Sequence, residues 1–114
     1  MVNKYNAMSD FEINKRVADC LGVAWHVIGS DGSWVYADKY CELGDGGKAI
    51  DLPDYCNNPA DAWPIIVENK IFTRYDDVVM NQWMAGLNHQ NIVGLSNNPL
   101  RAAMIVYLMM IEGE

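Results

Sequence analysis

The sequence is short of basic residues: eight lysines and arginines stand against fifteen aspartates and glutamates, for a formal net charge of −7. Binding to a nucleic-acid backbone needs clustered cations that release counterions, so this balance disfavours direct nucleic-acid binding. The acidic residues are scattered and never form a run. An acidic DNA mimic that binds a nucleic-acid-binding host protein is therefore a minor alternative.

Cysteine is sparse and shows no paired pattern. Cys20, Cys41 and Cys56 are widely spaced, and no CxxC pair or Cys/His cluster accompanies them. We therefore expect no metal and no cofactor, and an odd cysteine count without such motifs fits a reducing cytoplasm. The G-D-G-G-K run at residues 44–48 lacks the spacing and the Ser or Thr of a phosphate-binding loop.

Long hydrophobic runs are also missing. The one continuously apolar stretch, residues 102–111, is too short to cross a bilayer. The N-terminus shows no charged segment followed by an apolar one, so we expect no signal peptide. These absences predict a soluble cytoplasmic protein without a membrane association.

The chain is rich in hydrophobic residues, which make up 51% of its 114 positions. That length and composition predict one compact domain with a single core. Residues 1–8 carry no clear pattern, and we expect a flexible N-terminus followed by one domain over residues 9–114.

Three segments have the signals of helices. Ser9 and Glu12 form a capping box before a four-residue apolar period that runs from Ile13 to Leu21, and Gly22 suits the residue past a helix end. Asn-Pro pairs at 58–59 and 98–99 place a cap residue before a proline at the first helical position. The runs NNPADAWPIIVEN and NNPLRAAMIVYLM therefore predict two further helices.

Pro64 complicates the second of these helices, because an internal proline removes a backbone hydrogen bond. A short strand at residues 65–67 is the alternative, and periodicity does not separate the two. The last helix has almost no polar face and must be covered on more than one side, by its own domain or by another copy of the chain.

The remaining segments favour strands. Residues 24–28 and 34–37 predict a β-hairpin, and residues 70–75, 79–85 and 92–95 are further strands, while residues 41–52 are expected to form an irregular loop. The predicted fold class is α+β, with three helices packed on a small, mostly antiparallel sheet.

Three blocks of sequence resemble a known family. SDFEINKRVA (9–18), DYCNNPADAWPIIVEN (54–69) and NPLRAAMIVYLMM (98–110) resemble the NinX-like proteins of lambdoid phages and prophages, small proteins of unassigned function. More distantly, the chain is similar to phage domains described as an α-β-α sandwich. The resemblance implies a phage or prophage product in the cytoplasm of a bacterial host. It also implies a helix in each block with a sheet between them, and it tips the choice at residues 65–67 toward the helix.

Candidate binding residues lie mainly in the loop before the second helix, where backbone amides and polar side chains often hold ligands. The candidates are Asp54, Tyr55, Cys56, Asn57, Asn58, Trp63 and Arg101. A Cys56 thiol near the positive end of that helix would have a lowered pKa, as a nucleophile needs, whereas a buried Cys56 is a packing residue. Arg101 is expected to pair with Asp61 or Asp54 and so to join two helix starts.

The function predicted from these features is a noncatalytic accessory protein that binds a host or phage protein. Tryptophan is enriched at binding hot spots, and a methionine-rich last helix suits an adaptable contact surface. A homodimer through that apolar C-terminal helix is a second partner prediction. The main alternative is a small enzyme that uses residues 54–56.

Overall fold

A computed structural model of the protein describes residues 4–23, 25–28, 34–36, 50–77, 81–88 and 90–112. Most of the irregular loop expected at residues 41–52 lies outside these ranges. The helical elements are η1 (Lys4–Ala7), α1 (Asp10–Leu21), α2 (Pro59–Asn69) and α3 (Pro99–Glu112). The strands are β1 (Trp25–Ile28), β2 (Trp34–Tyr36), β3 (Ile50–Asp51), β4 (Phe72–Asp76), β5 (Gln82–Leu87) and β6 (Gln90–Ser96).

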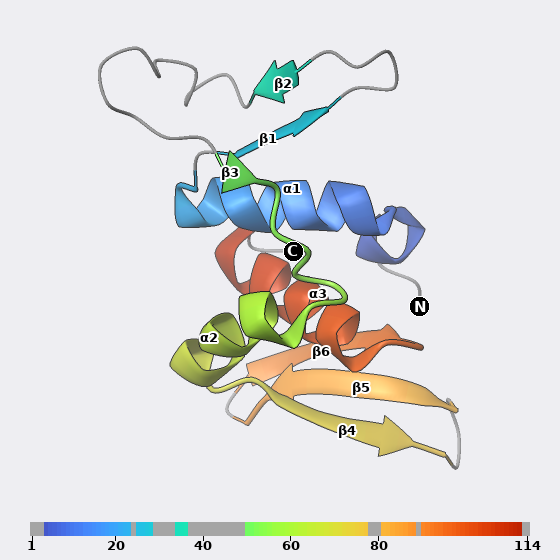
Figure 1. Cartoon of the computed structure of the whole chain (residues 1–114). Coiled ribbons are helices and arrows are strands. Elements are labelled where there is room, and N and C mark those ends of the chain that lie inside the picture. The colour runs from blue at the N-terminus through green and yellow to red at the C-terminus, as the bar shows by residue number, and fades with distance from the viewer. Residues whose placement is uncertain are drawn as a thin grey trace.

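The α+β fold class is confirmed, and its layers are arranged around α3. Strands β4, β5 and β6 form an antiparallel sheet, and α3 lies across one face of it (Figure 1). Helix α1 packs on the opposite side of α3, and α2 lies beside α3 (Figure 1). The described helices α2 and α3 lie on one side of this sheet (Figure 1).

The central place of α3 follows from its composition. Every residue from Ala102 to Leu108 is buried, so this helix is covered on all sides within one chain. A helix without a polar face is stable in water only in such a position. A homodimer through α3 remains a prediction, but the apolar surface from Ala102 to Leu108 is already used by the core.

Close packing of α3 on the sheet depends on Gly94 in β6. A Cβ atom at Gly94 would lie 2.5 Å from the carbonyl oxygen of Ala102 and 3.1 Å from a methyl carbon of Val106. Glycine therefore lets the backbone of α3 approach the sheet more closely than any side chain permits.

The predicted strands are present with shifted bounds. The hairpin of β1 and β2 is antiparallel, as expected, and β4, β5 and β6 follow one another as an antiparallel meander. The parallel pairing of β3 with β1 was not predicted. It joins residues about 25 positions apart, and local sequence patterns carry no signal for such a pairing.

The helix ends follow the local signals. The Ser9 hydroxyl accepts a hydrogen bond from the amide of Glu12 at 3.1 Å, and Gly22 ends α1 in the left-handed conformation with φ of 75°. The Asn58 side chain accepts from the amide of Ala60 at 3.0 Å. Pro64 lies inside α2, so residues 65–67 are helical and the alternative strand is wrong.

No sequence pattern pointed to the element before α1. Residues 4–7 form a short 3-10 helix, and the Tyr5 side chain is fully buried in the core. The Tyr5 hydroxyl donates a 2.6 Å hydrogen bond to Glu112 at the end of α3. No helix among the described residues has the length and apolar character needed to cross a membrane.

Candidate functional site

The starts of α1, α2 and α3 meet in one polar cluster, which we call the helix-start junction. Its members are Asp10, Asn14, Asp54, Cys56, Asn57, Asn98 and Arg101. The turn before α2 provides the centre, because the amides of Asn57 and Asn58 both donate to the carbonyl of Asp54, at 3.2 and 2.8 Å. This turn brings most of the predicted site residues together.

Asparagine side chains connect the elements at this junction. Asn14 of α1 donates to the Asp54 carboxylate at 3.0 Å and accepts from the amide of Cys56 at 3.0 Å. Asn98 caps α3 by accepting from the amide of Leu100, and its amide group donates to the carbonyl of Cys56 at 2.7 Å. Each side chain uses both its donor and its acceptor, so the junction is a structural cross-link.

Arg101 is the cation of this junction, and its predicted ion-pair partner was wrong. Its guanidinium pairs with Asp10 at 2.7 Å, rather than with Asp54 or Asp61. It also donates to the backbone carbonyls of Tyr5, Asn6 and Met8, at 3.2, 3.5 and 2.6 Å. The planar fork of arginine suits several acceptors at once. Arg101 therefore holds the N-terminal segment against the start of α3.

Cys56 lacks the properties of an activated nucleophile. Its side chain is fully buried. Burial, with a smaller contribution from the Asp10 carboxylate, raises the pKa of the Cys56 thiol to about 12. The hypothesis of a lowered pKa at the start of α2 is therefore wrong, because removal from water outweighs the helix dipole at this position.

The buried thiol makes stability depend on pH. Because its folded pKa lies above the ordinary value of 9.0, its contribution is fully present below about pH 9 and is lost as the pH rises towards about 12. We expect the free energy of unfolding to fall in this window by up to about 1.4 kcal/mol per pH unit from this thiol. Urea unfolding across the window should show a shallower fall in Cys56→Ala. Equal slopes in the two proteins would contradict this assignment.

Tyr55 and Asp61 lie at the other side of the same turn. Asp61 accepts a hydrogen bond from the amide of Asp54 at 3.0 Å. Burial, and then the charge of Asp61, raises the pKa of the Tyr55 hydroxyl to about 12. Tyr55 is thus a buried residue of the core, and its predicted binding role stays a prediction.

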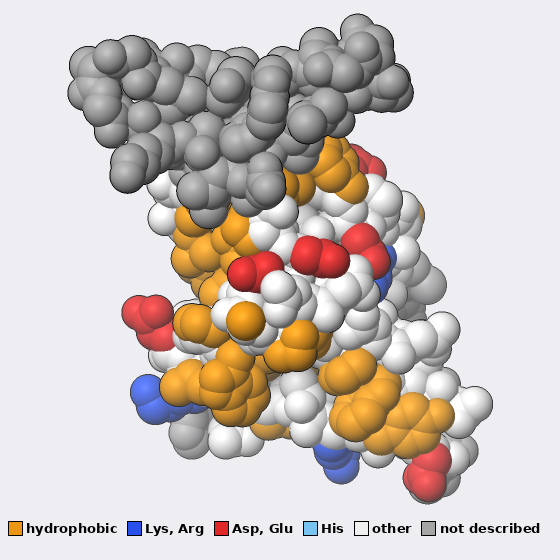
Figure 2. Space-filling view, viewed as in Figure 1, with side chains coloured by type: hydrophobic (Ala, Val, Ile, Leu, Met, Phe, Trp, Pro, Cys, Tyr) orange, Lys and Arg blue, Asp and Glu red, His pale blue; other side chains and the backbone are white. Residues whose placement is uncertain are grey.

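Trp63 is separated from this junction and lies on the outer side of α2. Its side chain is 61% exposed, and that of Val67 is 54% exposed. Ala60 and Pro64 are exposed as well, which gives an apolar stripe with the spacing i, i+3, i+4 and i+7. We call Ala60, Trp63, Pro64 and Val67 the α2 outer face. Figure 2 shows hydrophobic side chains gathered over α2.

The inner side of α2 is apolar too. Ala62, Ile65 and Ile66 are buried against the core. The helix therefore has two apolar sides, of which the fold uses one. Trp63 was predicted from the sequence as a binding residue, but its three companions were not, because they are recognised only once residues 65–67 are known to be helical.

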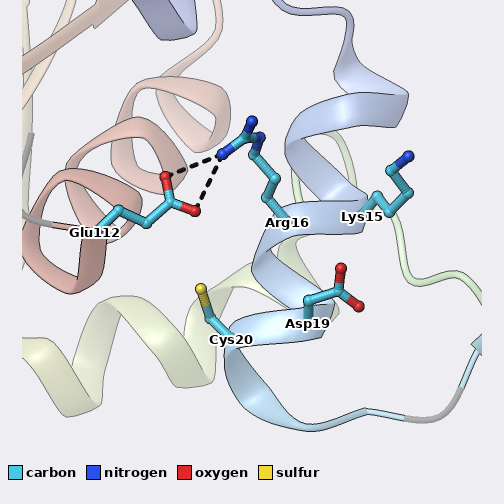
Figure 3. Close-up of a pocket in the computed structure, with 5 residues that line it drawn as sticks. All are labelled: Lys15, Arg16, Asp19, Cys20 and Glu112. Atoms are coloured by element: carbon cyan, nitrogen blue, oxygen red, sulfur yellow. Dashed lines mark hydrogen bonds and ion pairs between the residues drawn. The ribbon is translucent and has the colours of Figure 1, made fainter. Parts of the chain in front are cut away.

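A pocket of about 400 Å³ lies between α1 and the end of α3, lined by Lys15, Arg16, Asp19, Cys20 and Glu112 (Figure 3). Arg16 contacts both carboxylate oxygens of Glu112 at 3.2 Å. Glu112 also accepts from Tyr5. The charges of Arg16 and Glu112 thus serve to hold α1 and α3 together. Within the described ranges, no three His, Cys, Asp or Glu side chains are grouped as metal ligands.

The model of a family described as Bacteriophage P22, NinX matches residues 4–111. Neither a curated protein nor a solved structure matches the chain.

Proposed function

Because the chain belongs to the family described as Bacteriophage P22, NinX, we propose that it is a noncatalytic phage accessory protein. In this proposal it acts in the cytoplasm of the bacterial host, where it binds a host or phage protein. The α2 outer face is the contact surface.

The exposure of Trp63 is the observation that supports this proposal most strongly. A tryptophan in a small domain is normally a core residue, and exposing its large apolar surface to water is unfavourable. Here 61% of Trp63 is in water, next to Val67, which is 54% exposed. Tryptophan is enriched at binding hot spots, which are surrounded by contacts that exclude water from the interface. The burial of Cys56 argues against its thiol as the nucleophile of the alternative enzyme, which would use residues 54–56.

Recovery of the tagged protein from phage-infected host cells tests this function. We expect one partner to be retained by the wild type and lost by Trp63→Ala, with a loss of about 2 kcal/mol or more in binding, as for a hot-spot residue. Phe11→Ala is the matched control, because it removes a 46% exposed aromatic side chain from α1. It should retain the partner.

Two outcomes would contradict the proposal. The first is a partner retained equally by wild type and Trp63→Ala, and the second is no partner at any stage of infection. Both variants should unfold within about 0.5 kcal/mol of the wild type, since both side chains are exposed. Repeating the recovery at high salt separates an apolar contact, which persists, from an acidic DNA mimic, whose binding weakens.

A further inference from the structure

Resting on the proposed function, we infer that the α2 outer face binds a basic amphipathic helix of the partner. In this arrangement the partner's apolar side covers Trp63 and Val67. Its lysines and arginines lie along the acidic edge of α2. The inference depends on the chemistry that surrounds the apolar stripe.

The acidic edge is built into the helix itself. Asp61 and Glu68 are seven residues apart, so they lie on the same side of α2, two turns from each other. At about 100° per residue, both project beside Pro64 and border one edge of the stripe. The opposite edge is bordered by Pro59 and by the buried Ile66. Acidic charge therefore lies along one edge of the stripe.

The helix-start junction extends this acidic edge. The Asp61 carboxylate accepts a hydrogen bond from the backbone amide of Asp54. The side-chain amide of Asn57 donates to the carboxylates of both Asp54 and Asp10, at 3.2 and 3.1 Å. Figure 2 shows acidic side chains in a row between α1 and α2. Three carboxylates of the junction region are thus linked into one continuous acidic border.

Among the described residues, most of this acidic charge has no neutralising cation. Arg101 pairs with Asp10, but no ion pair joins Asp54, Asp61 or Glu68 to a cation among the residues that the structure describes. Lys70, which ends α2, adds one exposed positive charge at the far end. A partner helix with lysines or arginines beside its apolar side complements the acidic border. A partner helix with carboxylates in those positions is repelled.

The shape of the stripe favours a helix over an extended strand. From Ala60 to Val67 the stripe is about 10 Å long, which is two turns. Two helices pack by placing the side-chain ridges of one into the grooves of the other. A strand instead binds through the backbone groups of a sheet edge, and the backbone groups of α2 are used within the helix.

The test is a selection from a displayed library of helical peptides with a fixed apolar side. In each peptide, the positions that border the fixed apolar side on its two edges vary freely among Lys, Arg, Glu, Asp and Gln. Peptides are selected on the wild-type protein and counter-selected on Trp63→Ala. We expect the retained peptides to carry Lys or Arg along one edge.

The charge contribution is then measured with a double variant, Asp61→Asn with Glu68→Gln. We expect binding of a retained peptide to weaken roughly fivefold to tenfold, as for two exposed charge pairs. Glu12→Gln with Asp19→Asn removes two acids from α1 and should leave the affinity unchanged. Circular dichroism checks that both double variants keep the fold.

The outcomes separate the inference from the proposed function. Retained peptides with neutral or acidic edges, or an affinity unchanged by the Asp61 and Glu68 substitutions, would overturn the basic helix and leave the α2 outer face as the contact surface. No enrichment over Trp63→Ala would overturn both. Self-association in sedimentation that Trp63→Ala abolishes would assign this face to a second copy of the chain, and so overturn the basic partner.

Discussion

Replacing Gly94 by alanine is expected to lower the free energy of unfolding by about 3 kcal/mol, the upper part of the range for overpacked cores. The added methyl carbon would lie 2.5 Å from the carbonyl oxygen of Ala102, which belongs to the backbone of α3. Because backbone does not change rotamer, α3 and β6 have to separate. Urea unfolding followed by circular dichroism measures the loss.

Gly86→Ala is the matched control. Its added carbon would meet the ring of Phe72 at 2.9 Å and the carbonyl oxygen of Ile92 at 3.0 Å. The contacted ring atoms are at the far end of the half-buried Phe72 side chain, which can shift more readily than the backbone of α3. We expect a loss of about 1 kcal/mol. Equal losses at the two glycines would mean that the approach of α3 to β6 is not what fixes this packing.

Replacing Arg101 by alanine is expected to destabilise the protein by about 3 kcal/mol and to release the N-terminal segment. The substitution leaves Asp10 without its cation and removes the guanidinium donor from the carbonyls of Tyr5 and Met8. The side chain of Asp10 is 46% exposed, so the ion pair itself contributes little. Most of the expected loss comes from the hydrogen bonds that the largely buried Arg101 donates to backbone carbonyls, because bonds from a charged group are worth about 1.5–3 kcal/mol each. Unfolding in urea gives the loss in stability.

Hydrogen exchange identifies the segment that Arg101 holds. We expect faster exchange of the Met8 amide, which donates to Tyr5, before global unfolding. Arg74→Ala is the control, because that exposed side chain donates a hydrogen bond to the sulfur of Met84 at 3.4 Å. It should change the free energy of unfolding by no more than about 0.5 kcal/mol. An Arg101→Ala variant as stable as Arg74→Ala, with unchanged exchange at Met8, would contradict this role.

The helices were predictable because their signals are local. Ser9, Asn58 and Asn98 each accept a hydrogen bond from an amide two or three residues later. A capping bond of this kind is satisfied within a few residues, whatever the rest of the chain does. The glycine after α1 is equally local, and it was predicted for the same reason.

Pairings between distant residues were not predictable in the same way. The contact of β3 with β1 and the burial of Tyr5 both depend on how the helices pack. The partner of Arg101 shows the same limit. Several acids were available to it, and the packing of α1 against α3 selects Asp10, 91 positions away. Spacing along the sequence contains no information on that choice.

The candidate site was predicted in part. Asp54, Cys56, Asn57 and Arg101 do meet at the helix-start junction, but as cross-links between helix starts. Trp63 points away from them, on the side of α2 that the core does not use. Which side a helix buries depends on its neighbours in the fold. Because α2 is apolar on both sides, its sequence pattern alone did not indicate that the side with Trp63 stays in water.

The most direct test of the α2 outer face is a photo-reactive amino acid placed at position 63 in phage-infected host cells. Position 93 is the control, since Val93 is 40% exposed on the β4–β5–β6 sheet. We expect irradiation to link position 63, and not position 93, to one partner protein, and peptide mapping to place the link in a basic helical segment. Links from position 93 alone, or from neither position, would contradict the proposal that this face of α2 is where the protein binds.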